Sequence, residues 1–306
     1  MLHRFEDFHC QKEIPIKHYL QPQTLKEALG ILVKNEGRAR VIAGGTDVIP
    51  QLRRAELRVD VLVDITRIPG MGSIQAEGKT LCIGALVTHA QVCSSPLLRN
   101  GALILADGAG ALGSPQIRNI STVAGNLISG QPAADTSLPL LALGASVDIF
   151  SEGGEREVSL TEFFLDQGST AVDPRREILI RIRFPALLEN QAGSYLRLSK
   201  RRSLSLPILA VATVVDIDPE KKMFKDVALA MGPVAPVPVR AAKTEAMLRG
   251  APISEETVEM AGESASLESS PRSSSLRGSS GYRKEMVKVL VRRGLVQALT
   301  RAGASI

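Results

Sequence analysis

Two glycine-rich segments, about 80 residues apart, constrain this 306-residue chain more than any other feature. The first runs Val41-Ile-Ala-Gly-Gly-Thr-Asp-Val48, and the second runs Thr122-Val-Ala-Gly-Asn126 and continues to Pro132-Ala-Ala-Asp135. Glycine allows a backbone to approach a ligand closely, and the adjacent hydroxyl, amide and main-chain N–H donors suit a pyrophosphate. Neither segment has the spacing of a Rossmann G-x-G-x-x-G or a Walker loop, so the usual nucleotide-binding motifs are not indicated.

This pair of segments resembles the FAD-binding subunit of the molybdenum hydroxylases, the family of xanthine dehydrogenase, carbon monoxide dehydrogenase and the aromatic hydroxylases. In that family an A-G-G-T-D loop and a T-x-G-G-N loop wrap the FAD pyrophosphate. Here the first loop is intact from Ala43 to Asp47, and Ala124 replaces the first glycine of the second loop. The resemblance extends over nearly the whole chain, through stretches such as Pro115-Gln-Ile-Arg-Asn119 and Arg277-Gly-Ser-Ser-Gly-Tyr-Arg283.

The resemblance implies an α+β fold in three parts. A two-part FAD-binding region of the vanillyl-alcohol-oxidase (PCMH) type would come first, with subdomains at residues 1–57 and 58–187. A C-terminal domain at residues 188–306 would hold an antiparallel sheet with helices, of the CO dehydrogenase flavoprotein C-terminal type.

Local patterns in the sequence agree with this order of elements. Thr24-Leu-Lys-Glu27 is a capping box that precedes helical spacing, and a strand over 40–43 leads into the first glycine segment. We also expect one long helix over 96–108. Towards the C-terminus, strands are expected before helices, which is typical of an α+β domain; the strands are at 194–198, 208–217 and 224–231, and the helices at 240–249, 254–264 and 282–301.

Residue by residue, the resemblance assigns one set of positions to FAD binding. The set is Val41, Ile42, Ala43, Gly44, Gly45, Thr46, Asp47, Val48, Leu112, Thr122, Val123, Ala124, Gly125, Asn126, Asp135, Leu179, Tyr195 and Arg197. Pyrophosphate contact is expected from Gly44, Gly45 and Thr46, and an opposing clamp from the second segment. Asp47 is expected to hold its own loop together through backbone N–H groups, because its charge would repel phosphate.

Five of the other assigned positions have a specific expected role, and three of them have an alternative. Asp135 matches an acid that contacts ribitol or ribose hydroxyls, or it caps the helix that begins near Leu138. Leu112 would form an apolar wall, whereas Leu179 would either meet the flavin through its backbone or be an ordinary buried strand residue. Arg197 would place a cation that stabilises reduced, anionic flavin. Tyr195 is either a ring over the isoalloxazine or an ordinary strand residue, and we interpret His89 as structural.

Composition excludes several other classes of function. The net charge is +5 and Lys200-Arg201-Arg202 is basic, but aromatic residues make up only 3% and tryptophan is absent, so no base-stacking surface is indicated. Cys10, Cys82 and Cys93 lack C-x-x-C spacing, so we expect no iron–sulfur or zinc site on this chain. No apolar run approaches the roughly 20 residues that span a bilayer, and we expect a cytoplasmic protein.

The chemistry indicated is that of a bound flavin. No Ser-His-Asp, Cys-His or paired-carboxylate arrangement is present, so no side chain is assigned a catalytic role. The resemblance implies that electrons leave a molybdenum cofactor on a large partner subunit and cross [2Fe-2S] clusters on a small one. They would then reduce a non-covalent FAD on this chain and pass to NAD or another acceptor. A free-standing FAD oxidoreductase with its own small organic substrate, and an assembly subunit that has lost FAD, are the alternatives.

Overall fold

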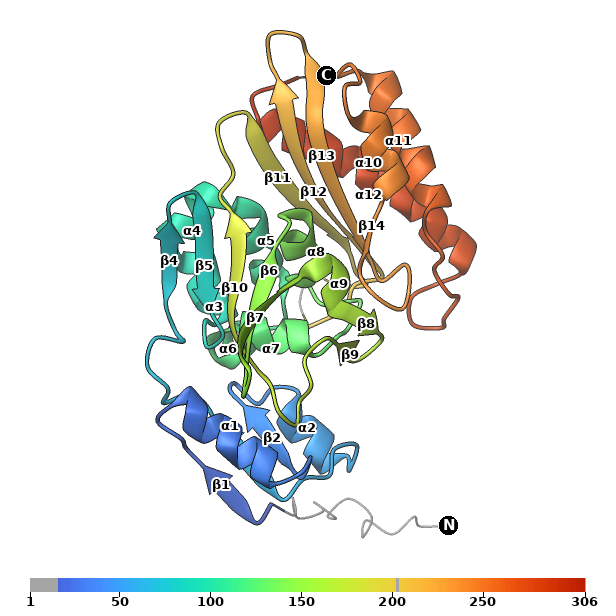
Figure 1. Ribbon diagram of the computed structural model, residues 1–306. Coiled ribbons are helices and arrows are strands. Elements are labelled where there is room, and N and C mark those ends of the chain that lie inside the picture. The colour runs from blue at the N-terminus through green and yellow to red at the C-terminus, as the bar shows by residue number, and fades with distance from the viewer. Residues whose placement is uncertain (1–15, 202–203, 306) are drawn as a thin grey trace, which may run out of the picture.

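Three sheets lie one after another along the molecule, as the computed structural model of the chain shows (Figure 1). The structure describes residues 16–201 and 204–305, so the predictions on Cys10 and Arg202 lie outside the described residues. Among the described residues no helix has both the length and the apolar character needed to cross a membrane.

The N-terminal sheet is a small parallel one with a helix on each face. Its strand order is β1-β3-β2, and its elements are β1 (His18–Leu20), α1 (Leu25–Lys34), β2 (Ala39–Ile42), α2 (Val48–Arg53) and β3 (Val61–Asp64). Alternate side chains of β3 explain the two layers: Val61 and Val63 belong to the main core with α1, whereas Leu62 packs with Leu52 of α2. Thr24 caps α1 by accepting a hydrogen bond from the backbone of Glu27, as the capping box predicts.

The middle of the molecule is an antiparallel five-stranded sheet covered by short helices (Figure 1). In sheet order its strands are β4 (Ile74–Glu77), β5 (Thr80–Gly84), β10 (Ile178–Pro185), β6 (Ser146–Ser151) and β7 (Gly154–Ser159). The helices are α3 (His89–Ser94), α4 (Pro96–Gly101), α5 (Leu103–Ala111), α6 (Pro115–Ile120), α7 (Val123–Ile128), α8 (Ser137–Ala142) and α9 (Leu160–Phe163), and a β8 (Phe164–Asp166) and β9 (Ser169–Thr170) hairpin follows.

Two elements of the middle region differ from the sequence-based prediction. The single helix expected over 96–108 is two helices, because Ala102 between them leaves the helical conformation with φ −160° and ψ 52°. The second glycine segment, expected as a loop, begins a helix: Thr122 caps α7 by accepting a hydrogen bond from the backbone N–H of Gly125. A Thr-x-x-Gly sequence offers the hydroxyl but no acidic third residue, so the capping signal was weaker than at Thr24.

The C-terminal sheet is antiparallel and has long helices on one face only (Figure 1). It comprises β11 (Gln191–Leu198), β12 (Leu209–Asp218), β13 (Met223–Gly232) and β14 (Val239–Arg240), with α10 (Ala242–Leu248), α11 (Glu255–Leu267) and α12 (Ser280–Arg301). Along β12, Leu209 and Val211 pack with these helices, whereas Ala210 and Ala212 face the main core. Alanine on that second face lets the sheet lie close to α5 and α8, so the sheet closes over the helical layer.

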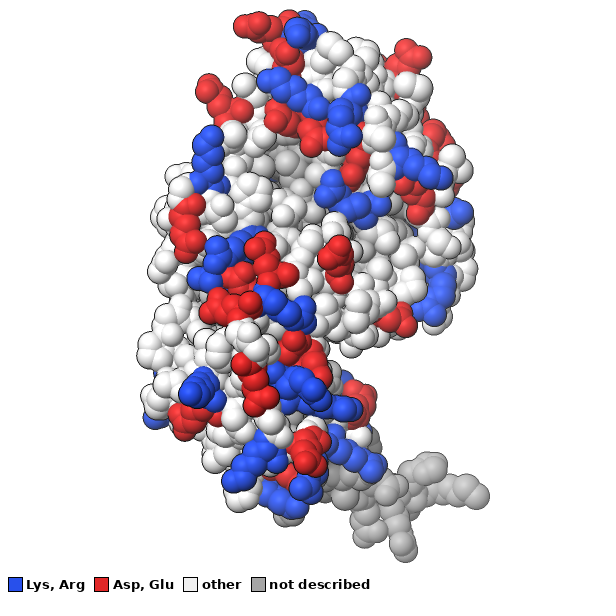
Figure 2. Space-filling model, in the orientation of Figure 1, with Lys and Arg blue, Asp and Glu red and all other residues white. Residues whose placement is uncertain are grey.

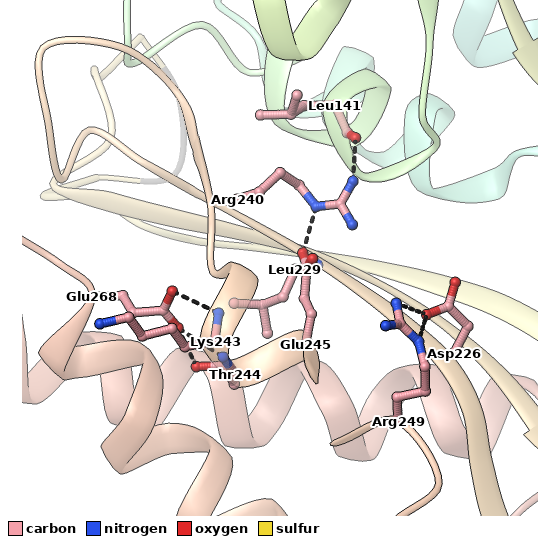
Figure 3. Close-up of polar contacts among 9 residues, drawn as sticks. All are labelled: Leu141, Asp226, Leu229, Arg240, Lys243, Thr244, Glu245, Arg249 and Glu268. Carbon is pink, nitrogen blue, oxygen red and sulfur yellow. Dashed lines mark hydrogen bonds and ion pairs between the residues drawn. The ribbon is translucent and has the colours of Figure 1, made fainter. Parts of the chain in front are cut away.

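A buried ion pair fixes this closure at one edge of the sheet (Figure 3). Glu245 of α10 pairs with Arg240 of β14 and also accepts a 2.7 Å hydrogen bond from the backbone N–H of Leu229. Arg240 in turn donates to the carbonyl oxygen of Leu141 in α8, at 3.3 Å. The pair therefore connects the C-terminal sheet, its first helix and the helical layer of the FAD-binding region.

Removing the charge of Glu245 tests how much this connection contributes to stability. Glu245→Gln keeps an acceptor for Leu229 but leaves the half-buried guanidinium of Arg240 without its counter-charge. We expect the free energy of unfolding, measured by urea denaturation, to fall by about 1–3 kcal/mol.

Asp226→Asn is the matched control, because the Asp226–Arg249 pair in the same domain is exposed (Figure 3). Its effect should stay within about 0.5 kcal/mol. Equal shifts in the two variants would show that the Glu245 pair adds no more than a surface pair.

Candidate functional site

A cavity of about 570 Å³ lies where the three parts of the chain meet. This volume is in the range of ligand and cofactor sites. The first glycine segment, the start of α7, the stretch before β10 and residues 204–206 all contribute to its wall. All but four of the positions assigned to FAD binding from the sequence line this cavity. The exceptions are Ile42 and Val123, which are core residues, and Tyr195 and Arg197.

The first glycine segment presents a row of free backbone donors to the cavity. It leaves β2 at Ile42, turns at Gly45 with φ +69°, and enters α2 at Val48. Within the described part of the chain, the N–H groups of residues 44–48 donate no hydrogen bond. Gly45 makes this arrangement possible, because its left-handed conformation is rare for residues with a side chain. Successive N–H groups of this kind form a concave site for an anion such as a diphosphate.

Gly44 is also required for packing within the chain. A Cβ there would lie 1.8 Å from the carbonyl oxygen of Ile120 and 3.1 Å from the Cα of Ser121. Gly44 therefore brings the first segment into contact with the backbone just before Thr122. The two segments identified from the sequence are direct neighbours.

The start of α7 adds two further donors to the wall. Thr122 uses its hydroxyl to cap Gly125 at 3.0 Å, and the N–H of Ala124 has no acceptor among the described residues. The side-chain oxygen of Asn126 accepts a 2.6 Å hydrogen bond from the hydroxyl of Thr136. This bond fixes the amide so that its NH₂ group is left as a donor.

Asp135 lies on the wall, and the two C-terminal residues assigned with it lie behind it. The hydroxyl of Tyr195 donates to Asp135 Oδ1 at 2.7 Å, and Arg197 lies 3.4 Å from the same oxygen. Arg197 also donates to the carbonyl oxygens of Ala111 and Ser205. Burial raises the pKa of Asp135, while Arg197 and then Tyr195 lower it. Tyr195 and Arg197 therefore hold a carboxylate that belongs to the cavity wall.

Three other assigned residues lie on the wall with different roles. Leu112 lines the wall as an apolar residue, and Leu179 lines it as a buried residue of β10, which is compatible with either of its two expected roles. Asp47 does not hold its loop together: its side chain accepts no capping hydrogen bond. Burial beside the cavity raises the pKa of Asp47, and Arg54 partly offsets this. The first glycine segment is instead packed against the backbone at Ile120 through Gly44.

Sequence reasoning missed two arginines of the cavity wall that lie far apart in the chain. Arg40 and Arg277 both line the wall, and within the described residues neither side chain has a hydrogen bond or an ion pair. Arg40 directly precedes the first segment, and Arg277 begins one of the stretches that carry the family resemblance. Neither signal distinguishes a cavity arginine from a surface one.

His89 is buried, as its structural interpretation requires, but it also touches the cavity. Its Nδ1 lies 2.9 Å from the carbonyl oxygen of Ser121, which can only accept, so the proton is on Nδ1. Nε2 is then an acceptor, and it has no hydrogen-bond partner among the described residues. Burial lowers the pKa of His89 to about 4.

The Gly44 contact gives a stability prediction. In Gly44→Ala the new methyl group meets backbone atoms that cannot move alone, so we expect a loss of about 3 kcal/mol or more in urea denaturation. The control is Gly30→Ala inside α1, where a Cβ would meet nothing within 4 Å. That change should leave stability equal or slightly higher, because alanine favours helix. A Gly44→Ala protein as stable as the parent would contradict the proposed contact.

The buried imidazole gives a pH prediction. Between pH 6.5 and 4 the unfolded chain binds a proton that folded His89 does not, so the fold loses stability as the pH falls through this window. The loss assignable to His89 is about 3 kcal/mol, and it is complete near pH 4. In His89→Gln, denaturation midpoints should depend less on pH across the window. His18→Gln, which alters an exposed strand residue, should keep the parental slope.

Charges and metal-binding groups favour no other site. Acidic and basic residues are interspersed on the face shown in Figure 2, with no separate basic patch of the kind nucleic acid requires. No group of three histidine, cysteine, aspartate or glutamate residues within the described ranges could hold a metal ion.

Comparisons with known proteins agree with this geometry. Residues 10–187 match the family described as FAD binding domain in molybdopterin dehydrogenase, and residues 194–298 match the CO dehydrogenase flavoprotein C-terminal domain. The chain is 29% identical over 94% of its length to the xanthine dehydrogenase FAD-binding subunit of Escherichia coli O157:H7, of which 98% is covered.

Solved structures lead to the same family. Carbon monoxide dehydrogenase from Hydrogenophaga pseudoflava superposes with a TM-score of 0.89 at 28% identity, over 94% of this chain and 98% of that one. Quinoline 2-oxidoreductase from Pseudomonas putida 86 gives 0.86 at 25% identity, over 94% and 98%. The family resemblance and the α+β fold expected from the sequence are thus confirmed. The chain belongs to the FAD-binding medium subunits of the xanthine dehydrogenase and CO dehydrogenase type of oxidoreductase.

Proposed function

We propose that this chain binds one FAD non-covalently in the central cavity and transfers electrons within a molybdenum hydroxylase complex. The observation that carries the proposal is the row of free N–H groups at residues 44–48, next to the donors of Ala124 and Asn126. Two segments far apart in the sequence thereby supply one cradle for an anion. A diphosphate fits this cradle, because it offers several acceptors and a charge that unpaired donors stabilise.

The remaining wall suits the other parts of the cofactor. Asp135 is held by Tyr195 and Arg197 at Oδ1 and lines the cavity wall, where it suits hydroxyl groups of the ribitol or ribose. Leu112 and Leu179 provide apolar surface for a flat ring. When bound, FAD supplies the redox chemistry, and the side chains of this protein position it and set its electrostatic surroundings.

The partners follow from what the described residues lack. They contain no cluster of metal-binding side chains, so molybdenum and iron–sulfur centres would belong to other subunits. We propose a molybdopterin-binding large subunit and a [2Fe-2S] small subunit as partners, with NAD or another acceptor downstream. The relatives support this, since they are described as the medium chain or FAD-binding subunit of dehydrogenases. We propose the cytoplasm as the compartment, because Cys82 and Cys93 are free thiols.

A flavin titration of the purified chain tests the cofactor assignment. FAD should bind saturably, with quenching of its fluorescence, and acid precipitation should release all of the flavin. Co-purification of two further polypeptides would separate the complex from a free-standing FAD oxidoreductase. Failure of the chain to bind FAD, or flavin retained in the acid pellet, would contradict the proposal.

A glycine pair refines this test. Gly45→Ala and Gly78→Ala both place a side chain on left-handed backbone, at φ +69° and +64°. The new Cβ at position 45 would also lie 3.2 Å from Ile42 and 3.3 Å from Ile49, whereas at position 78 it meets nothing within 4 Å, so Gly45→Ala should cost more in folding. Only Gly45→Ala also distorts the donor row, so its Kd for FAD should rise about tenfold or more, the value of one lost charge-assisted hydrogen bond. Gly78→Ala should bind FAD like the parent. Equal affinities in the two variants would place the diphosphate elsewhere.

A further inference from the structure

One cation in the cavity comes from the C-terminal domain. Arg277 lies in the loop between α11 and α12, and it reaches the same cavity wall as residues 204–206. The loop is held in shape around it: Ser274 and Gly278 exchange backbone hydrogen bonds of 2.9 and 3.0 Å. The backbone N–H of Arg277 also donates to the hydroxyl of Ser274 at 2.9 Å. The position of Arg277 is therefore set by its own turn.

The side chain of Arg277 has no counter-charge. Within the described residues it makes no hydrogen bond and no ion pair, although it is half-buried. Burial lowers its pKa, and the nearby Arg283, which feels its charge, is a second cation. The carboxylates that line the cavity beyond Asp47 are already engaged: Asp135 by Arg197 and Glu177 by Arg156.

Arg283 and Arg197 differ from Arg277, because most of their donors are used. Arg40 resembles Arg277 in having no side-chain partner among the described residues. Arg283 is buried and donates to the carbonyl oxygens of Ile208, Arg272 and Pro233. Arg197 is held by Asp135 and two carbonyl groups. Keeping a guanidinium partly desolvated without a partner costs free energy, and an anionic ligand would remove that cost. The fold thus holds a free, forked cation against the wall of a cofactor-sized cavity.

We infer that Arg277 binds an anionic group of the flavin cofactor and so fastens the C-terminal domain to the cofactor. This inference rests on the proposed function. Two parts of the cofactor have the required chemistry: the diphosphate, which is always anionic, and the flavin ring, which becomes anionic on reduction. In either case the residue acts by charge, from the opposite end of the chain to the donor row at residues 44–48.

The test compares Arg277→Gln with Arg272→Gln and Arg277→Lys in the full chain. Arg272 is in the same loop, but it is exposed and does not line the cavity, and among the described residues its side chain bonds only Gln167. If the diphosphate is the partner, Arg277→Gln should raise the Kd for oxidised FAD about tenfold, and the difference should shrink at high salt. If the reduced ring is the partner, the Kd for oxidised FAD should hold while the midpoint potential of bound FAD falls. Arg277→Lys should recover part of either effect, because it keeps the charge.

Two results would overturn the inference. One is an Arg277→Gln protein that matches Arg272→Gln in both the Kd and the midpoint potential. The other is an equal loss in Arg277→Gln and Arg277→Lys, which would indicate a structural role for the side chain instead of a charge. A parent chain that binds no FAD at all would reject the proposed function itself, so the two failures are distinguishable.

Discussion

The contact between Gly44 and the backbone at Ile120 is the constraint on which the cavity depends. A glycine hydrogen is the only substituent that fits there, since a Cβ would lie 1.8 Å from the carbonyl oxygen. The contact joins the N-terminal parallel sheet to the helical layer of the middle region. Gly44 begins the first set of N–H donors, at residues 44–48, and Ile120 comes shortly before the donor of Ala124. One close approach therefore determines the positions of both sets of donors. The site is therefore built by backbone geometry first and by side chains second.

The C-terminal domain completes the site by a second, electrostatic closure. Asp135 comes from the connection between α7 and α8, whereas Tyr195 and Arg197 are neighbours on one side of β11. A carboxylate buried at this depth is costly unless it is paired, and Arg197 together with the Tyr195 hydroxyl supplies the pairing. The alanines of β12 allow the approach that makes these contacts possible. The packing of the β12 alanines thus sets the distance between the C-terminal domain and the middle region. The Asp135–Arg197 ion pair fixes their relative position.

The sequence predicted the site well where it is local and poorly where it depends on distant contacts. The glycine segments lie on the wall as expected, because each is a short continuous stretch. The break at Ala102 escaped prediction because apolar residues continue on both sides of it. The sequence placed Tyr195 and Arg197 near the cofactor but could not show that Asp135 lies between them and the cavity. Arg277 is a surface arginine by every local criterion, and only the fold brings it to the wall.

The distribution of unpaired groups gives the cavity a second physical role. Donors in protein interiors are almost always paired, yet this wall gathers the N–H groups of residues 44–48, the N–H of Ala124 and the guanidinium of Arg277. Under the proposed function these groups come from all three parts of the chain, so a bound dinucleotide would satisfy each part at once. A ligand that binds only the folded state stabilises it by RT ln(1 + [L]/Kd), which is about 3 kcal/mol at a hundredfold excess over Kd. The cofactor would then hold the three sheets together as well as carry electrons, because the free energy of binding and that of domain closure arise from the same contacts.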